Sequence, residues 1–230
     1  MDLPSKAVYK ILANKGIDKI FHANSVLTAC QFLRSGSLLS RGMVERRGYQ
    51  QTSQYSDDLD KKHGLWFDVF TDSTDIHERA SRQNKYGPVS FVLDAELISE
   101  AYTGKIWVTK LNPTKWAGTT EDQRWFRSLA ELESDLQEGT FDQMIVFRHS
   151  GGELPIKKYL VEVILDDPEL ETPKRKIDFF SMGYGALKLA MTEGGMDIPV
   201  YKRECASGCR CGAYYANNMT WARKMYIPKA

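Results

Sequence analysis

Short runs of β-branched and aromatic residues constrain the fold of this chain most. They are bounded by Gly, Pro, Asp, Ser or Thr, which is typical of strands that end in turns. Six runs are predicted to be strands: residues 18–23, 65–70, 89–93, 105–111, 143–148 and 159–165. A sheet is therefore the expected centre of the fold.

Helical segments separate these runs irregularly. Apolar periodicity and cap residues, such as Asn24 or Ser25 before a helix and Gly36 after it, predict helices over 5–16, 26–35, 75–85, 95–103 and 120–137. The charged residues 41–64 are expected to form a loop or a frayed helix, and the last fifty residues give no clear prediction. No Gly-rich phosphate loop is present in the sequence. We therefore predict an α+β fold with short mixed or antiparallel sheets and flanking helices.

The length and composition fit one domain. A chain of 230 residues buries a substantial core, and no apolar stretch reaches the roughly 18 residues needed to span a membrane. The first residues lack the basic and apolar pattern of a secretory signal. We expect a cytoplasmic protein with a single domain over 1–230, of which 174–230 is a C-terminal extension.

Charge is balanced overall but not along the chain. Lys and Arg total 31 against 30 for Asp and Glu, whereas basic residues clearly outnumber acidic ones from Lys174 onward. Aromatic residues are interleaved with these cations. Cations that neutralise phosphates beside rings that stack on bases are typical of a surface for single-stranded nucleic acid. A solvated face over an aromatic core is the alternative.

Several motifs occur in an order that resembles DarT-type ADP-ribosyltransferases. The first is an aromatic-His-x-Asn sequence containing His22 and Asn24, followed by a Leu-Leu-Ser turn that ends in Ser40 and Arg41. The motifs that carry the resemblance lie at residues 21–25, 33–41, 67–70, 86–93, 141–146 and 154–160. The resemblance covers about 18–166, with a poor match over 41–64. It implies an ADP-ribosyltransferase-like core.

The resemblance implies that NAD is the substrate and that ADP-ribose is transferred to a base in single-stranded DNA or RNA. It also implies a toxin controlled by an antitoxin protein. Proteins of this group place a catalytic glutamate where this chain has Gln143. A carboxylate near the ribose stabilises the cationic transition state, and a glutamine amide carries no charge to do so. The chain as written is therefore expected to be an impaired Glu-to-Gln variant.

Three explanations for Gln143 remain open at the sequence level. The glutamine is an engineered substitution, it marks a natural pseudoenzyme, or the acid lies elsewhere, at Asp142 or Glu153. Asp142 points to the opposite strand face from Gln143, and Glu162 is expected on an outer face. A transferase for protein side chains and a catalytically dead module that binds NAD or nucleic acid are the alternative functions.

The resemblance also suggests the residues that contact NAD. His22, which is also a catalytic candidate, and Asn24 are expected at the nicotinamide ribose and amide. Arg41, with Arg46 as its alternative, is expected at a phosphate, because a guanidinium forms forked hydrogen bonds to phosphate oxygens. The full predicted NAD-binding set is His22, Asn24, Ser40, Arg41, Phe70 and Tyr86.

Two segments contain residues that bind metals in other proteins. Asp72, Asp75 and His77 are closely spaced, although helix capping explains these acids more simply. Cys205, Cys209 and Cys211 fall within seven residues, in a spacing that matches neither a zinc knuckle nor a common iron–sulfur motif. The predicted NAD site itself contains no metal. Zinc at the three cysteines would need a fourth ligand, such as Cys30 or a histidine; otherwise these are free thiols.

Overall fold

A mixed sheet runs through the molecule in the computed structural model, which describes residues 2–79, 84–100, 104–205 and 209–228. Within these residues its eight strands are ordered β1-β6-β7-β4-β2-β5-β9-β10, and each pair is antiparallel except β9 with β10. The strands are β1 (Leu3–Pro4), β2 (Lys19–Asn24), β4 (Val69–Asp72), β5 (Val89–Asp94), β6 (Lys105–Val108), β7 (Met144–Phe147), β9 (Leu160–Asp167) and β10 (Val200–Glu204). A two-stranded sheet pairs β3 (Ser37–Leu39) with β8 (Glu153–Pro155).

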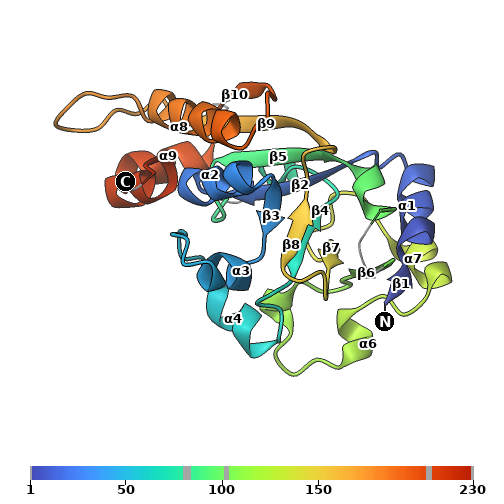
Figure 1. Cartoon of the computed structure of the whole chain (residues 1–230). Coiled ribbons are helices and arrows are strands. Elements are labelled where there is room, and N and C mark those ends of the chain that lie inside the picture. The colour runs from blue at the N-terminus through green and yellow to red at the C-terminus, as the bar shows by residue number, and fades with distance from the viewer. Residues whose placement is uncertain (1, 80–83, 101–103, 206–208, 229–230) are drawn as a thin grey trace.

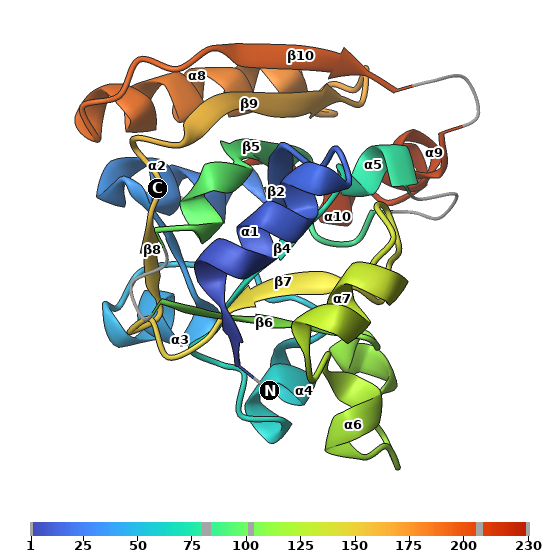
Figure 2. The same ribbon diagram turned by 90° about the vertical axis from the view of Figure 1, so that its right-hand side faces the viewer.

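Helices flank the sheet, as Figures 1 and 2 show. The α-helices are α1 (Ser5–Asn14), α2 (Val26–Ser35), α3 (Arg41–Arg46), α4 (Asp57–Lys62), α5 (Ile76–Arg79), α6 (Glu121–Arg124), α7 (Leu129–Asp135), α8 (Phe179–Glu193), α9 (Arg210–Asn217) and α10 (Met219–Tyr226). The 3-10 helices are η1 (Ala95–Ile98) and η2 (Pro113–Lys115). None of the described helices is long and apolar enough to cross a membrane. The predicted α+β class with a mixed sheet is confirmed.

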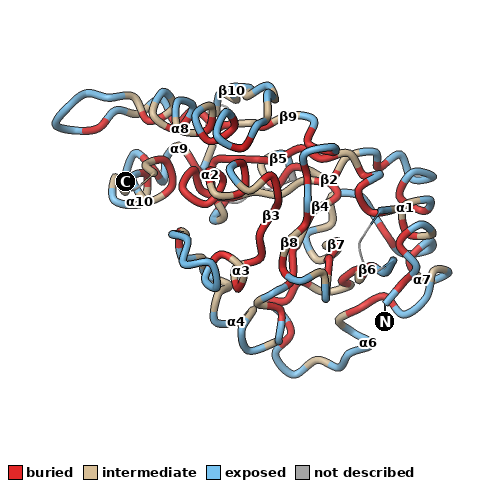
Figure 3. The backbone as a smooth tube through the Cα atoms, in the orientation of Figure 1, coloured by how far each residue is buried: buried red, intermediate tan, exposed pale blue. Residues whose placement is uncertain are grey.

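Helix α2 lies at the centre of the core and packs against α8 and α10 (Figure 3). It begins after Ser25 and ends at Gly36, as predicted, and Gly36 adopts the left-handed conformation that closes a helix. Phe32, Phe91 and Phe179 are each almost completely buried. The buried face of α2 therefore joins the sheet to the C-terminal helices.

Some sequence predictions differ from the structure or were incomplete. Residues 41–64, expected to form a loop or a frayed helix, contain two short helices, α3 and α4, because Ser40 caps α3 by accepting a hydrogen bond from the Met43 N–H and acidic residues occupy the first turn of α4. The strand predicted over 65–70 begins only at Val69. Strands β3, β8 and β10 were not predicted.

The helix predicted over 120–137 is divided into α6 and α7. Trp125 between them is extended, with φ −127° and ψ 145°, and it forms a bridge with Thr109. The helix predicted over 75–85 is described only as α5, and residues 80–83 of that prediction lie outside the described residues. The helix predicted over 95–103 is the 3-10 helix η1, and residues 101–103 also lie outside the description.

Candidate functional site

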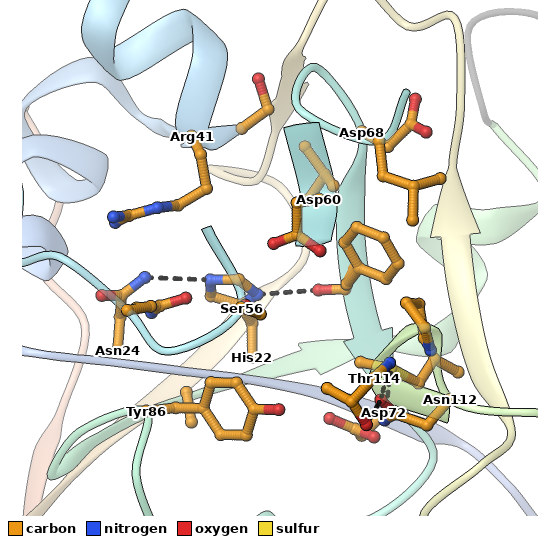
Figure 4. A pocket seen from close by; sticks show the side chains of 18 of the residues that line it. His22, Asn24, Arg41, Ser56, Asp60, Asp68, Asp72, Tyr86, Asn112 and Thr114 are labelled. Carbon is orange, nitrogen blue, oxygen red and sulfur yellow. Dashed lines mark hydrogen bonds between the residues drawn. The ribbon is translucent and has the colours of Figure 1, made fainter. Parts of the chain in front are cut away.

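A pocket opens where β2 and β4 face helices α3 and α4, with the segments before β5 and after β6 closing its sides (Figure 4). Residues from distant parts of the chain meet there. All six residues predicted to contact NAD line it: His22, Asn24, Ser40, Arg41, Phe70 and Tyr86. The tertiary fold therefore brings the predicted binding set together in one place.

His22 lies on β2 with its ring held in one orientation. Its Nδ1 lies 2.7 Å from the backbone carbonyl oxygen of Phe70, so Nδ1 carries the proton and donates it. Removal of water from the ring lowers the pKa of His22, and the Arg41 charge lowers it further. The imidazole is therefore neutral near pH 7, with an unprotonated Nε2.

Asn24 ends β2 and is anchored from both sides of its amide. Its Oδ1 accepts the Ser25 N–H at 2.9 Å, which turns Nδ2 toward Nε2 of His22 at 3.5 Å.

The backbone of Gly87 passes so close that an added Cβ would lie 2.3 Å from the Asn24 carbonyl atoms. Gly87 also has a φ of +142°, so this close approach needs glycine.

Arg41 begins α3 and is fixed by a forked ion pair. Its Nε and Nη2 donate to the two carboxylate oxygens of Asp57 at 2.9 and 2.7 Å. Nη1 is buried and has no hydrogen-bond partner among the described residues. A buried guanidinium N–H without a partner is costly, and a polar ligand group in the pocket would satisfy it. The alternative residue, Arg46, lies at the far end of the same helix.

Acidic side chains were not predicted here, yet Asp60, Asp68 and Asp72 all line the pocket. Burial raises the pKa of the Asp60 carboxyl to about 6. Burial also raises the pKa of Asp68, although its ion pair with Arg148 at 2.8 Å opposes that change. These carboxylates give the pocket a negative character that suits a cationic group.

Phe70, on β4, and Tyr86, in the loop before β5, both line the pocket. Phe70 is half-buried and packs against the small cluster that includes Trp116 and Trp125. The Tyr86 N–H donates to Oδ1 of Asn84 at 2.9 Å, which holds its loop in place. Both residues therefore contribute to the pocket wall, and their contact with NAD stays a prediction.

Gln143 does not join this set. Its Oε1 accepts the Gln137 N–H at 2.7 Å and its Nε2 donates to the Asp135 carbonyl at 3.0 Å, so the side chain binds backbone at the end of α7. The next residue, Met144, lines the pocket instead. Successive side chains on a strand point to opposite faces, which accounts for the difference. Gln143 is therefore not among the described residues that line the pocket.

The alternative acids also lie elsewhere. Asp142 forms an ion pair with Lys115 at 2.8 Å and accepts the Asn112 N–H. Glu153 pairs with Arg47 at the surface. Glu162 lies on the β9 face near Tyr201, outside this pocket. The structure thus directs Asp142 and Glu153 to other partners, and Glu162 lies on an outer face, as expected, so none of the three is among the described residues that line this pocket.

The basic C-terminal region contains both core and surface. Phe179, Tyr215 and Tyr226 are buried, whereas Tyr184 and Tyr201 are exposed. Several of its cations are held by acids: Lys188 by Asp197, Lys202 by Asp167, and Arg203 by Asp166 and Asp75. The predicted continuous nucleic-acid surface is therefore partly an aromatic core with ion pairs around it.

The candidate metal ligands are separated into two groups. Asp72 lines the pocket, whereas His77 lies beside Cys209 and Cys211 on another part of the molecule. Cys30 is buried in helix α2, away from these cysteines. Cys30 therefore lies apart from this cluster, whereas His77 belongs to it.

Comparisons with known proteins found similarity to a solved structure. No protein-family model and no curated protein matches the chain. The chain is structurally similar to DarT from Thermus sp. 2.9, solved in complex with ADP-ribosylated single-stranded DNA. The sequences are 15% identical, the match covers 82% of this chain and 95% of that chain, and the TM-score is 0.48.

The pocket also contains residues that sequence reasoning missed. Asn112 caps η2 and Thr114 lies within it, and the Asn112 side chain accepts the Thr114 N–H at 3.0 Å. Asp60 lies in the charged segment that was expected to form a loop or a frayed helix. Asp57, Asp58 and Asp60 are close together there, and only the fold brings Asp60 into the pocket wall. The Ser-x-x-x-Asp spacing, about one helical turn, is the local signal that places Ser56 near Asp60.

Proposed function

We propose that this chain is an NAD-dependent mono-ADP-ribosyltransferase that modifies a base in single-stranded DNA or RNA. One observation carries the proposal: the six residues that the DarT-like motifs suggest for NAD line one pocket. They come from β2, the start of α3, β4 and the loop before β5. A chance motif match would scatter these residues over the surface. The resemblance adds an antitoxin partner to the proposal.

The pocket has the chemistry needed to bind the nicotinamide end of NAD. Neutral His22 offers Nε2 as a hydrogen-bond acceptor, and Asn24 offers an amide. The nicotinamide ring of NAD is cationic, and cleavage of its bond to ribose passes through a second cation. The carboxylates of Asp60 and Asp72 line the pocket, and there they would stabilise both the nicotinamide cation and the ribose cation of the transition state. Nη1 of Arg41 is left to bind a phosphate or hydroxyl oxygen.

Two positions are candidates for the residue that takes up the acceptor's proton, Asp60 and Gln143. Asp60 is already in the pocket, and its pKa of about 6 suits a group that takes up the acceptor's proton. Gln143 occupies the motif position and directly precedes Met144 in the pocket wall. We assign the role to Asp60 because its carboxylate faces the ligand space, whereas Gln143 binds backbone.

Paired substitutions test this assignment. Asp60→Asn is expected to lower NAD turnover by about 10²–10⁴-fold, the usual range for loss of a catalytic acid or base. Asp58→Asn is the matched control, because Asp58 lies in the same helix and is exposed. Gln143→Glu is expected to leave turnover nearly unchanged. A large rise with Gln143→Glu would instead assign the acid to position 143 and the native chain to an impaired variant.

An exposed aromatic ring at the mouth of the pocket offers a place for the acceptor base. Tyr55 is 81% exposed and stands between Gln54 and Ser56, which both line the pocket. The ammonium group of Lys85 lies 5.2 Å from its ring centroid. A ring that stacks on a base beside a cation that contacts phosphate is a recurrent way to bind single strands. We place the acceptor strand across Tyr55.

The acceptor is tested by separating the products of labelled NAD. Wild type and Gln143→Glu are incubated with NAD labelled in the adenylate, and DNA, RNA and protein are then isolated. Label in one nucleic-acid pool is expected, and Tyr55→Ala should reduce it several-fold while NAD binding persists. Tyr49→Ala is the control, since Tyr49 is also exposed but neither of its chain neighbours lines the pocket. Label only in protein would refute the nucleic-acid acceptor, and no label in any pool would refute the transferase.

A further inference from the structure

A second constellation lies away from the pocket, where α5 meets the start of α9 (Figure 2). His77, Cys209 and Cys211 each place a potential ligand atom within 4.8 Å of the others. Cys205, which follows β10, is in hydrogen-bonding contact with Cys209. Four side chains of the types that bind zinc thus come from α5, from the residue that follows β10 and from the start of α9.

The distance between the ligand atoms of His77 and Cys209 suits a tetrahedral metal. Nε2 of His77 lies 3.6 Å from Sγ of Cys209. Zinc bonds of about 2.3 Å to sulfur and 2.0–2.1 Å to nitrogen, set at the tetrahedral angle, separate the two ligand atoms by about 3.6 Å. The two side chains are therefore already at the distance that one shared zinc ion requires.

The surroundings orient the ligands as they do in zinc sites. Nδ1 of His77 donates to Oδ2 of Asp166 at 2.8 Å, which leaves the Nε2 lone pair directed at the thiols. Asp166 is itself held by Arg203 at 2.6 Å. Histidine ligands commonly donate their second N–H to a carboxylate in this way. The backbone N–H of Asn84 also donates to Sγ of Cys211 at 3.0 Å, which holds this sulfur in place.

We propose that His77, Cys205, Cys209 and Cys211 bind one structural Zn²⁺ ion. Four protein ligands leave no open position for substrate, so the ion would stabilise the fold and take no part in the reaction. It would tie α9 to α5 and, through the Asn84 N–H, to the loop that presents Tyr86 to the pocket. The proposal is independent of NAD chemistry.

A Cys–His–Asp triad is the competing interpretation of the same contacts. Cys209, His77 and Asp166 follow one another as a nucleophile, a base and an orienting acid would. Such a triad needs a single thiol and an adjacent substrate cleft. Two further cysteines beside the first favour the metal instead.

Metal content tests the proposal directly. The full chain is purified without a metal-affinity tag, and zinc is measured by mass spectrometry. About one zinc per chain is expected. Cys209→Ser, Cys211→Ser and His77→Gln should each reduce the content at least several-fold, whereas Cys30→Ala, at a buried cysteine outside the cluster, should retain it. Circular dichroism verifies that each variant is folded.

Two measurements on the unmodified chain apply even where a variant does not fold. Mercurial titration of the thiols should release the zinc, and cobalt should replace it with the intense visible bands of a tetrahedral thiolate site. Folded wild type that holds no zinc and gives no cobalt spectrum would overturn the proposal. A disulfide between two of the cysteines would overturn it too. So would rapid alkylation of Cys209 that depends on His77 and is unaffected by added zinc.

Discussion

At the scale of single residues, the pocket depends on side chains whose properties are set by burial. Asp60 illustrates this because its carboxyl has a pKa of about 6, against an ordinary value of 3.8. An unfolded chain releases this proton at lower pH than the folded chain does. Folding therefore becomes less favourable as the pH rises from about 4 through 6, and the loss of stability reaches its full size above that window.

Asp60→Asn should consequently stabilise the protein at neutral and higher pH. The expected gain at pH 8 is on the order of 1–3 kcal/mol, and it should nearly vanish at about pH 3, where the Asp60 carboxyl is largely protonated in both the folded and the unfolded chain. Thermal unfolding of wild type and variant at both pH values measures it. Asp58→Asn, exposed in the same helix, should show no such gain. A stabilisation equal at both pH values would contradict the burial of Asp60.

Gly87 gives a second prediction at this scale. Its φ of +142° and its approach to the Asn24 backbone leave no room for a methyl group. Gly87→Ala should cost about 2–4 kcal/mol and weaken NAD binding, because the backbone of Asn24 or Tyr86 must move. Urea unfolding and NAD titration measure the two effects. Gly185→Ala, in helix α8 with no atom within 4 Å of the added Cβ, should be neutral or slightly stabilising.

At the scale of elements, local signals and tertiary contacts decided different features. Ser25 and Gly36 bound α2 as predicted, because capping and the left-handed turn act within one helix. The helix predicted over 120–137 was interrupted because Trp125 is buried and extended, with its ring 5.0 Å from both Trp107 and Trp116. Helical periodicity does not reveal a residue that packs better outside the helix.

Trp125→Ala should test what this interruption contributes. Removing a ring that is 1% exposed is expected to cost about 3–5 kcal/mol and to disturb the Asp68–Arg148 pair, since Arg148 lies 5.4 Å from that ring. Trp66→Ala, at a half-buried ring, should cost clearly less. Urea denaturation compares the two. A cost below about 1 kcal/mol for Trp125→Ala would mean that the contacts of Trp125 with Trp107 and Trp116 do not hold the segment between α6 and α7 in place.

At the scale of the whole molecule, the C-terminal region belongs to the core. Tyr215, Ala222, Met225 and Tyr226 are buried, and the Tyr226 hydroxyl donates to the Asp166 carbonyl at 2.9 Å. Helix α10 packs against α2 and α8, which carry the centre of the core. Removing it would expose an apolar face on both helices.

A chain that ends at Glu204 should therefore fail to fold. Losing several buried side chains at roughly 2–5 kcal/mol each exceeds a typical stability of about 5–15 kcal/mol. Solubility and circular dichroism measure the outcome. A chain that ends at Pro228 is the control, and Cys209→Ser separates loss of packing from loss of the proposed zinc. A stable, folded chain ending at Glu204 would refute this account.

The sequence by itself determined the α+β class, the caps of α2 and the order of the motifs that meet in the pocket. These depend on periodicity, local hydrogen bonds and residue types, which act over a few positions. Only the tertiary structure directed Gln143 to backbone, buried Asp60, and brought His77 to a cysteine 132 positions away. Those outcomes depend on which surfaces pack together, and packing partners distant in the chain leave no local pattern.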